Sequence, residues 1–306
     1  MGGNFIKIAA GRNNWKRFLS SFVLLLGFMF LGSIAYFTAS GWYVTNDGDP
    51  ASYYDAKKAE NVHIDPLADF VLSHIIYVFW FFGLALLMRL IHKRSIKTLI
   101  TADKNLNWKK VAWGFAVFFS LIAGTTIIDF ILNPSDYSLN NIEVTDFFKL
   151  FLFVLILTPL QTTSEELLFR GYLMQWFGRK INNALLLSLI VGFIFASLHF
   201  SNPEMGYSRF FVGSDYLISG VLWCYISAKT NSSELTIGAH AANNMFIGWF
   251  LTMDDSVYGN IPSLFVVTNI DPKISLLWTI ISMGIFTYFS LKKFGGLNKP
   301  PGRLVS

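Results

Sequence analysis

One acidic pair and one arginine stand in the segment EELLFR, directly after the apolar run FFKLFLFVLILTPL (147–160). On a helix, Glu166 and Arg170 are i,i+4 neighbours with the acid N-terminal to the base, which is the favourable order for an ion pair. Glu165 is rotated by about 100° from Glu166, so it points elsewhere and is left available as a base. The alternative interpretation is that the trio ends a helix at the cytoplasmic interface, where Arg170 could snorkel.

Two further polar groups interrupt later apolar runs. His199 closes FASLH, and His240 and Asn244 lie four residues apart in HAANN, so that both face one side of a helix. Asn243 lies near the same face. Each of these side chains alone would be a buried polar group without a partner, which is unfavourable. Together with the free glutamate they could satisfy one another and bind a water, so the chemistry they indicate is acid–base work on that water.

The elements that must position these residues are membrane helices. The chain is 53% hydrophobic and only 14% charged, against about 25% charged residues in soluble domains. Unbroken apolar runs of about 20 residues fit helices that cross a bilayer. We therefore predict an all-α, polytopic membrane protein with about eight transmembrane helices, forming one integral membrane domain over 1–306. The predicted spans are 18–39, 67–91, 111–133, 147–170, 184–200, 210–228, 234–253 and 274–291.

Charge placement predicts orientation and excludes some classes. Lys and Arg gather before the first span and after every even-numbered one, which places both termini in the cytoplasm of a multi-pass cell-membrane protein. The other loops hold Asp47, Asp49, Asp55, Asp136, Glu143, Asp254 and Asp255, with Lys57 and Lys58 as exceptions. The net charge of +5 is spread over the short loops between the apolar runs and forms no single basic patch, which argues against a nucleic-acid partner. A single cysteine, Cys224, excludes an internal disulfide and a cysteine-based zinc site.

Other ionisable residues are weaker candidates. Asp129 and Lys149 are expected near the outer interface, and Glu204 and Arg209 in a solvated outside loop. Asp215 is expected either beside the polar cavity or at the outer interface.

The three motifs resemble those of a known family. EELLFR matches EExxxR, FASLH matches FxxxH and HAANN matches HxxxN, in the order found in the CAAX prenyl endopeptidase and bacteriocin-processing (CPBP, or Abi) intramembrane proteases. The resemblance covers about 145–255, which would be the catalytic core. It implies a polar intramembrane cavity enclosed by helices four to seven, and peptide hydrolysis by an activated water.

The resemblance also implies roles and partners. Glu165 would be the general base, His199 its partner in positioning the water, and His240 with Asn244 the oxyanion ligands, while Glu166 and Arg170 form the structural pair. The substrate would be a membrane-associated peptide, such as a prenylated protein C-terminus or a bacteriocin leader.

Metal dependence stays open at this stage. Glu165, His199 and His240 would suit a catalytic site for a divalent metal such as zinc, but their spacing is not HExxH. We expect a glutamate-activated water without tightly bound metal. One geometric difficulty remains: the predicted helix ends place Glu165 and His199 about 15–20 Å apart in depth at 1.5 Å per residue.

Two other functions compete with proteolysis. Intramembrane acids and histidines also mark proton or ion paths in transporters, although the first half of the chain holds no corresponding polar pair. The second alternative is a non-catalytic membrane scaffold of the same fold.

Overall fold

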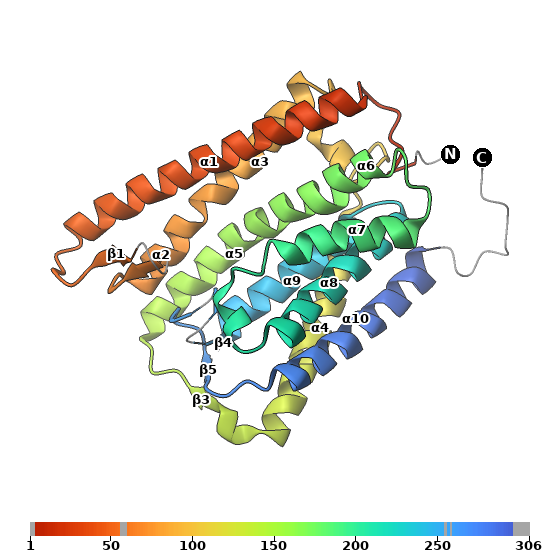
Figure 1. Ribbon diagram of the computed structural model, residues 1–306. Helices are drawn as coiled ribbons and strands as arrows, with labels where there is room; N and C mark the ends of the chain where they lie inside the picture. Colours follow the sequence, from red (N-terminus) through yellow and green to blue (C-terminus); the bar gives the residue numbers. More distant parts are fainter. Residues whose placement is uncertain (1–3, 56–59, 254–255, 258, 296–306) are drawn as a thin grey trace.

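The computed structural model describes residues 4–55, 60–253, 256–257 and 259–295, and shows a bundle of long helices (Figure 1). The all-α, polytopic fold is confirmed. Lys57, Lys58, Asp254 and Asp255, which entered the prediction of orientation, lie outside the described residues. The start of α1 and the end of α10 lie at one end of the bundle, and the short strands lie at the opposite end (Figure 1).

All eight predicted apolar runs are helical, and short helical turns join several of them. The helical elements are α1 (Trp15–Asn46), α2 (Pro66–Ser73), α3 (Ile75–Leu90), η1 (Ile96–Leu99), α4 (Trp108–Leu132), η2 (Pro134–Asp136), α5 (Val144–Glu166), η3 (Leu167–Leu173), α6 (Met174–Phe177), α7 (Ala184–Ser197), η4 (Pro203–Gly206), α8 (Arg209–Thr230), α9 (Glu234–Phe250) and α10 (Pro272–Phe294). The strands are β1 (Tyr53–Asp55), β2 (Glu60–Val62), β3 (Tyr137–Leu139), β4 (Leu251–Thr252) and β5 (Phe265–Val267), in two small sheets ordered β1-β2 and β3-β5-β4.

Six helical stretches in the described part of the chain are long and apolar enough to cross a membrane. The two remaining helices of the predicted eight are shorter. α7 has 14 residues and α9 has 17, which is about 21 Å and 25 Å of helix against a hydrocarbon core of ~30 Å. α9 is packed inside the bundle, whereas α7 keeps one apolar face exposed, with Phe193 65% exposed.

The fourth helical run is longer than predicted. α5 continues without a break through the π-helical segment η3 and α6 to Phe177, seven residues beyond the predicted end at 170. Glu165 therefore lies 12 residues, or about 18 Å, from the end of this run. α7 then climbs about 20 Å before His199. The chain thus travels about the same distance away from the depth of Glu165 as it then travels back to His199. The depth difference of 15–20 Å expected from the predicted helix ends is therefore wrong.

Close helix contacts position these elements. α9 packs on α4 with Gly238 against the backbone, where an added Cβ would lie 2.0 Å from the Val111 carbonyl oxygen. α7 and α8 meet in the same way at Gly192, where an added Cβ would lie 2.6 Å from the Val221 nitrogen. Only glycine allows backbones to approach this closely, so these contacts set where α7 and α9 present their polar residues.

Candidate active site

Glu166 and Arg170 form a fully buried ion pair at the junction of α5 and η3. Arg170 Nη1 lies 3.1 Å from Glu166 Oε1, and both side chains are 0% exposed. The guanidinium also lies over two aromatic rings, 4.4 Å from the centroid of Phe195 and 5.2 Å from that of Trp223. Arg170 therefore links α5 to α7 and α8 from inside the bundle, and does not snorkel to an interface. A π-helical segment at this point is a feature often found at functional sites.

His240 on α9 bridges the two glutamates. Its Nδ1 lies 3.0 Å from Glu166 Oε1, and its Nε2 lies 3.8 Å from Glu165 Oε2. The ring packs on Trp223 with centroids 4.6 Å apart. An ionised carboxylate only accepts hydrogen bonds, so Nδ1–H must donate to Glu166. The distance from Nε2 to Glu165 is too long for a direct hydrogen bond, and a water molecule can join these two groups.

Glu165 itself is nearly buried, at 6% exposure. Gln161, one helical turn earlier on α5, donates from Nε2 to Glu165 Oε1 at 3.5 Å and to the Tyr77 hydroxyl at 3.3 Å. This glutamine was missed at the sequence level. Its i−4 spacing from Glu165 is the signal that could have found it, because that spacing places both on one helix face.

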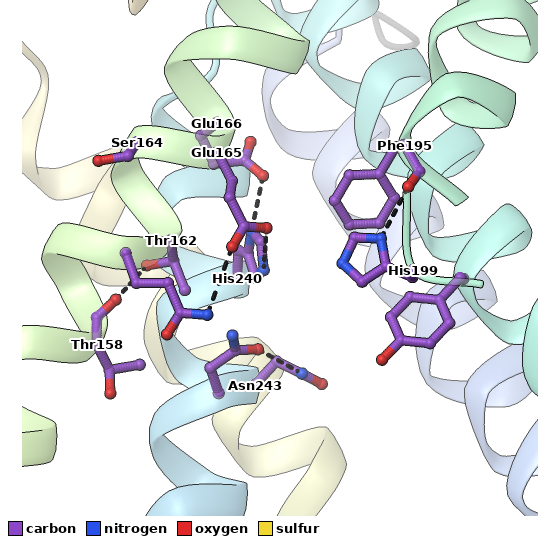
Figure 2. A network of polar contacts seen from close by, with 12 residues as sticks. Thr158, Thr162, Ser164, Glu165, Glu166, Phe195, His199, His240 and Asn243 are labelled. Atoms are coloured by element: carbon purple, nitrogen blue, oxygen red, sulfur yellow. Dashed lines mark hydrogen bonds and ion pairs between the residues drawn. The ribbon is translucent and has the colours of Figure 1, made fainter. Parts of the chain in front are cut away.

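His199 follows the last residue of α7 and faces Glu165 and His240 from the other side of the site (Figure 2). Its Nδ1 donates to the Phe195 carbonyl oxygen at 2.8 Å. In the neutral ring this bond leaves Nε2 as an acceptor. Phe195 packs against both imidazoles, with ring centroids 4.4 Å from His199 and 6.3 Å from His240. His199 also lies within electrostatic reach of Glu165 and His240.

The two amides of HAANN lie one turn further along α9. Asn243 Nδ2 donates to Asn244 Oδ1 at 2.9 Å. Since the Asn244 oxygen is engaged, its NH₂ group is the part left for other partners. Both asparagines are partly exposed, unlike His240 in the turn before them.

Tyr216 on α8 holds the far face of His199, and sequence reasoning missed it. The two rings stack with centroids 4.3 Å apart and an interplanar angle of 25°. The Tyr216 hydroxyl donates to Glu204, and Asn202 Nδ2 donates to both partners at 3.1 Å. The prediction that Glu204 is simply solvated is therefore wrong: its carboxylate is tied to the network behind His199. No spacing rule signals this contact, because it joins two separate elements.

The other ionisable candidates lie away from this network. Asp129 accepts from Tyr137 and Trp278, at 2.6 and 3.0 Å, and Lys149 pairs with Asp146 at 2.8 Å. Asp215 accepts from Thr279 on α10 at 2.8 Å. Each has a local partner and none contacts Glu165.

The donor set does not form a metal-binding geometry. Among the described residues, no three His, Cys, Asp or Glu side chains are grouped closely enough to hold a metal ion. Glu165 and His240 are adjacent, and the bond from Nδ1 of His240 to Glu166 leaves its Nε2 on the Glu165 side, but His199 is not grouped closely with them. The trio of Glu165, His199 and His240 thus does not fit a metal in this conformation.

Comparison with known proteins identifies the class. The sequence profile of the type II CAAX prenyl endopeptidase Rce1-like family matches residues 146–246, which contain the three motifs. The uncharacterized protein YyaK of Bacillus subtilis (strain 168) is 42% identical over 288 residues, covering 94% of this chain and 95% of that protein. No solved structure gives a significant match. The chain belongs to the CPBP family of CAAX-type intramembrane proteases, as a multi-pass membrane protein that acts on peptides.

Proposed function

We propose that this protein is an intramembrane endopeptidase in which Glu165 activates a water molecule held between Glu165, His199 and His240. The observation that carries the proposal is the position of His240, with Nδ1 on Glu166 and Nε2 3.8 Å from Glu165. That spacing is too long for a direct bond and suits one intervening water. No metal is needed for the steps below.

The tautomer of His199 determines how the bound water is oriented. One water hydrogen points to Glu165, which takes the proton as general base, and the other points to Nε2 of His199, which is an acceptor. The water oxygen attacks the carbonyl carbon of the scissile peptide. The C–N bond then breaks, and the proton held by Glu165 passes to the leaving nitrogen, so that an amine and a carboxylic acid result. Transfer of the acid's proton to the amine then gives a carboxylate and an ammonium group.

The oxyanion formed in this step needs donors. The Asn244 NH₂ group is one, because its oxygen already accepts from Asn243. His240 is the second when its Nε2 carries a proton. Donors placed beforehand around a developing charge are typically the largest electrostatic contribution to such catalysis.

Purified protein in detergent, incubated with a panel of membrane-anchored peptides, tests this function. Cleavage should be lost in Glu165→Gln, which keeps the shape of the side chain but cannot act as a base. Lys149→Gln is the matched control on the same helix, since Lys149 is exposed and pairs only with Asp146. Cleavage that survives in Glu165→Gln would refute the assigned base. Absence of cleavage by the wild type would favour the transporter or scaffold alternatives.

A further inference from the structure

The partly exposed residues of the site lie on one side of it, away from the end where α1 begins and α10 ends, and three helical runs contribute to this pattern. On α5, exposure rises from 0% at Glu166 to 6% at Glu165, and Gln161 is partly exposed. On α9, His240 is 4% exposed and Asn243 is partly exposed. On α7, Phe195 is buried and His199 is partly exposed. On each run the partly exposed residue lies further from the end where α1 begins and α10 ends, and beyond the site α5 and α9 are buried again on their inward faces, at Val154 and Trp249. In Figure 2, Asn243 lies at the level of Thr158, on the side of His240 away from Glu166.

The opposite path, towards the termini, is closed by packed residues. All seven residues of η3 are buried. Gly171 in this segment lies directly against η1, where an added Cβ would be 2.5 Å from the Leu99 carbonyl oxygen. Gln175 Nε2 donates to the Thr98 carbonyl at 2.7 Å, and Arg94 Nη1 donates to Gln175 Oε1 at 2.9 Å. η3 is therefore covered on that side by η1 and by the hydrogen-bonded side chains of Arg94 and Gln175.

Two more segments complete this closure. The turn before α9 joins the loop after η1, because Ser233 N donates to the Ile100 carbonyl at 2.9 Å. The N-terminal segment before α1 lies across the same end: Phe5 is 0% exposed, and its backbone N–H donates to Asn231 Oδ1 at 2.8 Å. Arg12 N donates to the His92 carbonyl at 2.7 Å.

The closed end is also the basic end. The Lys and Arg residues there lie before and in the first turn of α1 and α4, in the last turn of α3, α8 and α10, between α3 and α4, and after α6: they are Lys7, Arg12, Lys16, Arg17, Arg89, Lys93, Arg94, Lys97, Lys104, Lys109, Lys110, Arg179, Lys180, Lys229, Lys292 and Lys293. At the open end the described residues hold only Lys149, Arg209 and Lys273, beside several acids. Basic loops are retained on the cytoplasmic side of a membrane. The closed end therefore faces the cytoplasm.

The short α7 provides the opening on the other side. It ends about 21 Å from its cytoplasmic start, well short of a ~30 Å hydrocarbon core. The polar segment that follows, with Asn202 and Glu204 bonded to Tyr216, lies within the outer half of the membrane. Irregular polar backbone is tolerated at that depth only where it is buried in protein or lines a water-filled cavity.

We infer that the site opens to the extracytoplasmic side, and that its substrates are peptide segments exposed at the outer face of the membrane. This inference rests on the proposed function, because what enters the opening is taken to be a scissile peptide. A C-terminal tail presented from the cytoplasm would instead meet the closed end at η1 and η3.

Cysteine labelling of the full-length protein tests the opening. In a Cys224→Ala background, Asn243→Cys and, as a second position, Gln161→Cys should react with a membrane-impermeant maleimide in right-side-out vesicles and not in inside-out vesicles. Ser138→Cys on β3 is the outer control, and Lys180→Cys after α6 is the cytoplasmic control. Labelling of the site cysteines together with Lys180→Cys, or inverted labelling of the two controls, would overturn the inference.

A paired activity measurement separates this inference from the proposed function. An impermeant peptide panel should be cleaved by right-side-out vesicles only, and the activity should be lost in Glu165→Gln. Cleavage that depends on Glu165 but occurs only in inside-out vesicles would overturn the inference and leave the proposed function standing. If neither orientation nor the detergent-solubilised protein shows Glu165-dependent cleavage, the proposed function fails and the substrate class fails with it.

Discussion

Replacing Arg170 by methionine should destabilise the protein more than any other single removal of a charge in the site. Methionine keeps much of the packing against Phe195 and Trp223, so the main effect is the loss of the ion pair with Glu166. Removing one partner of a buried pair costs ~3–5 kcal/mol because the other charge stays buried. Glu166 would keep its bond from His240 at 3.0 Å. We therefore expect the lower end of that range, with the lost cation–π contacts adding ~0.5–2 kcal/mol.

The measurement is the free energy of unfolding from SDS titration in mixed micelles. Glu166→Gln combined with Arg170→Met should recover a large part of the loss, since the charge that Arg170 had balanced is then removed with it. Lys149→Met, which breaks the exposed i,i+3 pair with Asp146, is the control and should not change the unfolding midpoint. If the free energy of unfolding of Arg170→Met lies within ~1 kcal/mol of the wild-type value, the loss is only that expected for an exposed ion pair. Glu166 would then not be a buried charge that needs Arg170 as its partner.

Three further outcomes are expected. Tyr216→Phe should retain most peptidase activity, because the ring still stacks on His199, whereas Tyr216→Ala should lower kcat/KM with unchanged folded yield. Equal activity of the two variants would contradict the positioning role. Burial lowers the pKa of His92, which follows α3, to about 4. The unfolded chain, with a pKa of ~6.5, then binds the extra proton between these values. Stability should therefore fall as the pH drops from about 6.5 to about 4, and His92→Gln should flatten that slope in melts across this range. Gly238→Ala should reduce folded yield, judged by gel filtration, because its Cβ would meet α4 backbone, while Gly124→Ala, with open space around it, should not.

The sequence predicts the helices well because lipid leaves few alternatives for a long apolar run. Helix ends were less predictable. The run holding Glu165 was expected to stop at 170, and a snorkelling Arg170 at that end was the alternative to the pair with Glu166. Its burial against Phe195 and Trp223 depends on side chains from α7 and α8, which no local pattern reveals. The end at Phe177 in turn removes the apparent depth mismatch between Glu165 and His199.

Spacing within one helix was informative about the site, and contacts between helices were not. The i,i+4 relation of Glu166 and Arg170 could be predicted, because it follows from helical geometry alone. The contact of His240 with both glutamates could not, because it depends on how α9 is rotated against α5. The same limit applies to Tyr216 and Glu204, which reach His199 from α8 and from the loop after α7.

Adjacent glutamates in one motif thus have different surroundings, and Arg170 balances the charge of only one of them. Glu165, Glu166 and Arg170 alone would leave one net negative charge in a bundle core, which is unfavourable in a medium of low polarity. His240 lies between the two carboxylates, with Nδ1 3.0 Å from Glu166 and Nε2 3.8 Å from Glu165, so it is the polar partner that both share. In the proposed mechanism the water proton passes to Glu165, so the negative charge moves from that carboxylate to the oxyanion beside His240. In that mechanism the structural pair is also an electrostatic support, because Glu166 orients His240 through Nδ1 and Arg170 offsets the charge of Glu166.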